Sequence, residues 1–86
     1  MVTQRFKIKR RDFERKPIGV FQHKLRVFLK CYTIRDMLLD EINCTVSFKK
    51  SHRVSGIKVL DPKEYTIYYE TEEAENPHEI YLKITI

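Results

Sequence analysis

The sequence predicts a small α+β fold in which a mixed or antiparallel sheet of four to six strands packs on one helix. Two observations lead to this expectation. Apolar and polar residues alternate over several short segments, with the period of a half-buried strand. Residues 33–43 instead repeat their apolar side chains with the period of a helix. A chain of 86 residues has room for one core, so we expect a single domain over residues 1–86.

Two strands are expected in the first third of the chain. Residues 5–11 place apolar side chains on one side and basic side chains on the other. Residues 24–31 repeat this pattern, and their inward side chains would be Leu25, Val27, Leu29 and Cys31. Between these strands we expect a turn at residues 12–17 and a short extended piece at residues 18–21, with a bulge near Gly19.

The helix is expected at residues 33–43. Thr33 followed by Asp36 resembles a capping box, and Asn43 is a typical residue at a helix end. The apolar stripe of this helix would consist of Ile34, Met37, Leu38 and Ile42.

The second half of the chain predicts further strands. Residues 44–49, 55–60 and 80–86 alternate, and the last of these is the clearest strand pattern in the sequence. Residues 64–70 fit two readings, because their Tyr side chains suit a strand and also share one face of a helix. We favour the strand. Residues 72–78 are expected to form an acidic loop.

The cysteine count and the apolar runs bear on the compartment. Cys31 and Cys44 are too few for the disulfide scaffold of a small secreted domain, so we expect two reduced thiols. The chain has no run of about 20 apolar residues that would cross a bilayer, and no secretory signal pattern. These features favour an intracellular protein of the cytoplasm or the nucleus.

Charge is sorted along the chain and points to a binding function. Residues 1–30 hold ten Lys or Arg against Asp12 and Glu14, a net charge of +8. Residues 61–86 hold seven Asp or Glu against Lys63 and Lys83, a net charge of −5. Asymmetry of this kind governs association with charged partners.

The outward face of the first two expected strands is the main candidate site. If the strands are neighbours, like charges lie opposite each other and oppose folding by about 0.2 to 1 kcal/mol per pair. An acidic partner surface covering this face would relieve that repulsion. The candidate binding residues are Arg5, Lys7, Lys9, Arg11, Lys24, Arg26, Phe28 and Lys30.

The sequence is also compatible with two other partners, a single-stranded nucleic acid and a second copy of the chain. Single-stranded RNA or DNA is the alternative ligand, because Phe28 would lie inside the basic face and offer a base a stacking surface. The acidic residues form a secondary patch that could meet the basic face of another copy, which predicts electrostatic self-association. This patch consists of Glu70, Glu72, Glu73 and Glu75.

We expect no catalytic, cofactor or metal site. The three His residues are dispersed, no Cys and His spacing matches a zinc site, and the two glycines are too few for a phosphate loop. The sequence therefore predicts a non-catalytic protein–protein interaction module.

The expected order of two strands, a helix and further strands resembles the ubiquitin-like β-grasp superfamily. The resemblance rests on residues 6–9, 33–42 and 80–86, and is strongest to a Phox-and-Bem-type interaction domain of the basic class. In that family a basic residue of the opening strand pairs with an acidic loop of a partner domain. The resemblance implies that Lys9 has this role, with Lys7 as the other register.

Overall fold

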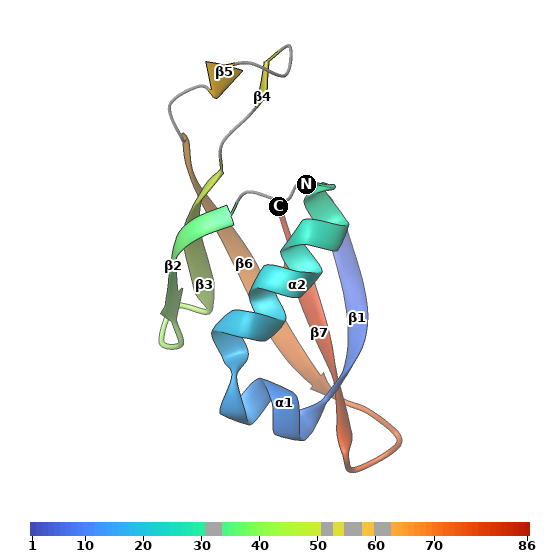
Figure 1. Cartoon of the computed structure of the whole chain (residues 1–86). Coiled ribbons are helices and arrows are strands. Elements are labelled where there is room, and N and C mark those ends of the chain that lie inside the picture. Colours follow the sequence, from blue (N-terminus) through green and yellow to red (C-terminus); the bar gives the residue numbers. More distant parts are fainter. Residues whose placement is uncertain (31–33, 51–52, 55–57, 60–62) are drawn as a thin grey trace.

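A five-stranded antiparallel sheet and two helices make up most of the protein (Figure 1). The computed structural model describes residues 1–30, 34–50, 53–54, 58–59 and 63–86. Its elements are β1 (Thr3–Lys9), α1 (Arg10–Arg15), α2 (Pro17–Leu29), β2 (Ile34–Asp40), β3 (Thr45–Lys50), β4 (Arg53–Val54), β5 (Lys58–Val59), β6 (Lys63–Glu73) and β7 (Glu79–Thr85). The strand order of the sheet is β1-β7-β6-β3-β2, while β4 and β5 pair only with each other. The α+β class and the antiparallel sheet are confirmed.

The first and last strands of the chain are neighbours in the sheet. β1 pairs with β7 in an antiparallel register in which Phe6 lies opposite Leu82. The two ends are joined by hydrogen bonds of 2.9 Å between the N–H and C=O groups of Val2 and Ile86. Among the described strands β1 pairs with β7 alone, so it is an edge strand of the sheet.

The core lies between α2 and one face of the sheet (Figure 1). Phe21 and Leu25 of α2 are fully buried, over a sheet face that includes Phe48, Ile67 and Leu82. The Phe21 ring also meets the Tyr69 ring edge-on, with centroids 4.9 Å apart. Full burial of such side chains stabilises a fold by about 1.5 to 3 kcal/mol each.

Residues 10–15 and 17–29 form helices, so the prediction of a turn at 12–17, an extended piece at 18–21 and a strand at 24–31 is wrong. Pro17 lies in the first turn of α2, where its missing N–H costs nothing. The helix buries Phe21 and Leu25 but leaves the Val27 side chain 53% exposed, although the strand pattern placed Val27 in the core. Gly19 lies within the helix rather than at a bulge. Cys31 lies outside the described residues.

The predicted helix at residues 33–43 is also wrong, because residues 34–40 form β2. The register shifts between Arg35 and Leu38, and Asp36 in this bulge has a φ of 52°. Because a bulge inserts one extra residue, apolar and polar residues do not alternate regularly in the sequence of this strand. Leu38 is 70% exposed and Ile42 is 93% exposed, so the expected apolar stripe is not a core face. Thr33, the expected cap, lies outside the described residues.

Residues 41–44 form the turn that replaces the expected helix end. The Asp40 carboxylate accepts hydrogen bonds from the backbone N–H groups of Ile42 and Asn43, each at 3.1 Å, and from the Asn43 side-chain amide at 2.8 Å. These hydrogen bonds, the Asn43 side chain first, hold the pKa of Asp40 below its ordinary value. A local Asx turn thus sets the β2–β3 hairpin.

Four of the expected strands are present. The predictions at residues 5–11, 44–49 and 80–86 match β1, β3 and β7 with shifted ends, and the strand reading of 64–70 is confirmed by β6. The expected strand at 55–60 lies largely outside the described residues. The acidic segment 72–78 begins inside β6, because that strand continues to Glu73.

Two alanine substitutions separate the helix from the strand reading of residues 24–31. We expect Leu25→Ala to lower the free energy of unfolding by about 2 to 5 kcal/mol, because Leu25 is fully buried. Val27→Ala should change it by less than about 0.5 kcal/mol, because Val27 is exposed on a helix. Urea unfolding followed by circular dichroism measures both. Equal losses at the two positions would contradict this packing.

Candidate anion-binding groove

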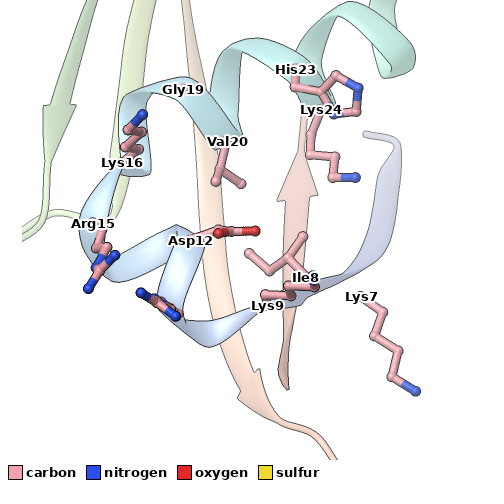
Figure 2. A pocket seen from close by; sticks show the side chains of 11 residues that line it. Lys7, Ile8, Lys9, Asp12, Arg15, Lys16, Gly19, Val20, His23 and Lys24 are labelled. Carbon is pink, nitrogen blue, oxygen red and sulfur yellow. The ribbon is translucent and has the colours of Figure 1, made fainter. Parts of the chain in front are cut away.

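A groove of about 590 Å³ lies between β1 and the two helices (Figure 2). Its walls come from three consecutive elements of the chain, and its floor contains the apolar side chains of Ile8 and Val20. Figure 2 shows the Asp12 carboxylate and the Val20 side chain within this space, while Lys7 points away from it. The lining residues are Lys7, Ile8, Lys9, Arg11, Asp12, Arg15, Lys16, Gly19, Val20, His23 and Lys24.

Helix geometry explains why the groove is open and basic on its α2 side. Lys16, Val20, His23 and Lys24 follow the spacing i, i+4, i+7 and i+8, which places them on one helical face. Gly19 lies on the same face and has no side chain to fill the groove. A Cβ atom added there would meet only the Cβ of Lys16 at 3.8 Å, an ordinary contact distance.

The charge of the groove is almost entirely positive. Six of its lining residues are Lys or Arg, and Asp12 supplies the sole carboxylate among them. Lys7 forms an ion pair with Glu79 at 3.8 Å. Within the described ranges, none of the other five basic lining residues forms an ion pair. A concave surface with one sign of charge concentrates counter-ions and attracts anionic groups.

The opposite face of the sheet also carries charge, and several of its charged side chains form ion pairs. Lys83 of β7 lies 3.0 Å from Glu72 and 3.8 Å from Glu70, both of β6. Arg5 of β1 lies 3.8 Å from Glu72, and its guanidinium stacks 4.1 Å from the centroid of the Tyr81 ring. Acidic residues of β6 and β7 thus pair with Arg5 and Lys7 of β1, while Lys9 has no ion pair in the described ranges.

The secondary acidic patch predicted from the sequence is thus divided by the fold. Glu70 and Glu72 lie on the outer face of the sheet beside Lys83. Glu73 instead binds Arg10, whose guanidinium also donates a hydrogen bond to the Pro77 carbonyl at 3.1 Å. Glu75 lies exposed in the turn between β6 and β7.

The predicted basic face of two neighbouring strands does not exist, because the second of those strands is α2. Four of its eight residues, Lys7, Lys9, Arg11 and Lys24, come together around the groove. The other four do not line it. Arg5 lies on the outer face, Arg26 and Phe28 lie elsewhere on α2, and Lys30 ends that helix with a φ of 52°. The Phe28 ring is partly buried beside Phe6, with centroids 6.4 Å apart.

The sequence-based site prediction missed three groove residues with basic side chains: Arg15, Lys16 and His23. Arg15 and Lys16 fell in the expected turn at residues 12–17, and His23 fell between the expected segments 18–21 and 24–31. Their signal was the helical spacing of Lys16, Val20, His23 and Lys24, which becomes visible once residues 17–29 are read as a helix.

Metal ligands, thiols and membrane-spanning helices are three further features to consider in the part of the chain that the structure describes. No three His, Cys, Asp or Glu side chains in it converge as metal ligands. Cys44 is an exposed thiol in the β2–β3 turn. None of the helices in the described ranges is long and apolar enough to span a bilayer.

The chain matches no protein-family model, no curated protein and no solved structure. The β-grasp resemblance therefore stays a prediction. Its element order differs from the observed one, in which both helices precede the second strand of the chain.

The Lys83 pairs make a prediction about pH. The hydrogen bond and charge of Glu72, and then the charge of Glu70, raise the pKa of Lys83 above its ordinary value of 10.5. Because the folded-state pKa is the higher one, these pairs stabilise the fold fully below pH 10.5, and their contribution is lost as the pH rises through the folded-state pKa. Glu72→Gln should lower the Lys83 pKa more than Glu70→Gln, as measured by NMR titration of the lysine Cε and Hε signals. An unchanged pKa in Glu72→Gln would contradict this arrangement.

Proposed function

We propose that this protein is a non-catalytic interaction module that binds an acidic segment of a partner protein in the groove between β1, α1 and α2. One observation carries the proposal. The groove collects five Lys or Arg side chains without an ion pair in the described ranges against one carboxylate, while Arg5, Lys7 and Lys83 on the opposite face of the sheet pair with acidic residues of β6 and β7. Positive charge without internal partners is what an acidic ligand complements.

The strength of such a contact follows from the exposure of the groove. Each exposed ion pair contributes about 0.2 to 1 kcal/mol, so several are needed for specific binding. Because the pairs are exposed to solvent, salt should weaken the contact. Association should also be fast, since the positive field extends beyond the surface and steers an anionic ligand toward the groove.

The apolar floor of the groove favours a protein ligand over a nucleic acid. Ile8 and Val20 offer contacts to aliphatic side chains, and no Phe, Tyr or Trp is among the groove residues. Phe28, which supported the nucleic-acid alternative, packs against the core, as do Phe13 and Phe21. A base would therefore find phosphate contacts here but no aromatic ring for stacking. Single-stranded RNA or DNA remains the competing ligand that the experiment must include.

Self-association through the acidic patch has weaker support than binding to another protein. Glu70 and Glu72 already pair with Lys83, and Glu73 pairs with Arg10. A second copy would have to displace these internal contacts to reach the carboxylates. Light scattering at low salt should accordingly report a monomer.

A peptide titration with three point variants tests the proposed function. The probe is a labelled seven-residue peptide of alternating Thr and Glu, with the Thr and Gln version as the uncharged control. Lys9→Ala and Lys24→Ala should each weaken binding by about two- to fivefold, corresponding to one exposed pair. Asp12→Asn should strengthen it, because this change removes the only carboxylate of the groove. Fluorescence anisotropy measures all four affinities.

The matched control for these variants is Lys63→Ala, which removes a basic side chain at the start of β6 and outside the groove. Its affinity should equal that of the unaltered protein. Equal binding of the Gln peptide, or equal losses at Lys63 and Lys24, would contradict the proposed site. Binding of mixed-sequence RNA or DNA without binding of the Glu peptide would show that the ligand of the groove is a nucleic acid and not an acidic protein segment.

A further inference from the structure

The free edge of β1 runs beside the groove and carries unused backbone groups. Val2 exchanges hydrogen bonds with Ile86, and the Arg10 N–H donates to the His78 carbonyl, so even-numbered residues of β1 turn their N–H and C=O groups toward β7. The odd-numbered residues Thr3, Arg5 and Lys7 must turn theirs outward. No strand of the described sheet lies on that side.

The two faces of the sheet at this edge differ in whether their basic side chains have acidic partners. Side chains of the odd-numbered residues lie on the outer face of the sheet, where Arg5 and Lys7 already have acidic partners. On the helix side, the Lys24 ammonium lies 5.5 Å from the centroid of the Phe6 ring, and the groove opens beside Ile8. Four groove cations without an ion pair in the described ranges, Arg11, Arg15, Lys16 and Lys24, belong to the segment of the two helices and lie on the helix side of the edge.

These charges also select against a second copy of β1 as the added strand. In an antiparallel pair of two β1 strands, Arg5, Lys7 and Lys9 of one copy would share a face with the same residues of the other. Like charges in that position oppose pairing. Lysines on an edge strand are a common means of preventing edge-to-edge association. An acidic strand meets no such repulsion.

We propose that the acidic segment binds as an additional antiparallel strand on the free edge of β1, with alternate acidic side chains directed into the groove. The inference rests on the proposed function and adds how the ligand is held. Backbone hydrogen bonds to Thr3, Arg5 and Lys7 supply affinity, and the basic helix side supplies selectivity for charge.

Strand geometry fixes which ligand residues do which task. A ligand residue opposite Arg5 or Lys7 forms the backbone hydrogen bonds, and its side chain lies on the outer face. The residue between them lies opposite Phe6 with its side chain on the helix side, close to Lys24. Its own N–H points away from β1. Acidic side chains and hydrogen-bonded amides therefore belong to alternate residues of the ligand.

N-methylation of the Thr and Glu peptide tests this alternation on the unaltered protein. N-methyl groups on the Thr residues should weaken binding at least tenfold, because they remove the amides that face β1. N-methyl groups on the Glu residues should change the affinity by less than threefold. Equal effects in the two peptides, or a larger loss in the Glu series, would overturn strand addition. If the unmodified peptide binds and both methylated peptides bind as well, the groove function stands and the strand pairing is wrong.

A pair of protein variants examines the same edge from the other side. Lys7→Pro and Lys7→Gln both remove the cation, but only the proline removes the outward N–H, which the β1–β7 pairing does not use. The proline variant should bind the unmodified peptide at least tenfold more weakly than the glutamine variant, at similar thermal stability. Equal affinities would contradict the proposal, as would a dimer in light scattering that Lys7→Pro dissociates. The methylated peptides decide the matter if Lys7→Pro does not fold.

Discussion

The packing of α2 on the sheet is the constraint on which the other features depend. The helix connects the edge strand β1 to the far edge strand β2, and it buries Phe21 and Leu25 over the intervening strands. Because one helical face is committed to the core, the residues beside that face must line the boundary between helix and edge strand. That boundary is the groove. Its basic character is thus a consequence of which residues the helix leaves uncovered.

The fold divides the sorted charges of the sequence into ion pairs on the outer face of the sheet and basic side chains at the groove that have no ion pair within the described residues. Placing β7 between β1 and β6 brings the basic start and the acidic end of the chain onto one face, where Glu72 meets both Arg5 and Lys83. Such exposed pairs contribute little individually, but they remove the repulsion that a purely basic face would cause. Among the groove residues, the basic side chains without an ion pair in the described ranges are Lys9, Arg11, Arg15, Lys16 and Lys24. A net charge of +5 is therefore distributed unevenly, with its excess at the groove.

The sequence predicted the strands whose alternation is regular and failed where two periods competed. Residues 80–86 and 44–49 alternate without interruption, and both were found as strands. At residues 24–31, Leu25 and Leu29 satisfy both periods, and only the exposure of Val27 separates the helix from the strand. At residues 34–40 a bulge at Asp36 shifts the period by one residue. Four of the eight candidate site residues line the groove, and two of these, Lys7 and Lys9, lie on a correctly predicted strand.

The basic side chains of the edge strand β1 oppose edge-to-edge association of the sheet. In the proposed mode of binding they also favour an acidic ligand. An edge strand exposes backbone N–H and C=O groups that can pair with another extended chain. The basic side chains of Arg5, Lys7 and Lys9 on β1 oppose pairing with chains of like charge. If the neighbouring helix were neutral, these cations would simply repel strands of like charge. Lys16, which directly precedes α2, and Lys24 within it add positive charge on the helix side of the edge. Under the proposed strand addition, the cations that oppose pairing of two β1 strands are also those that select an acidic segment.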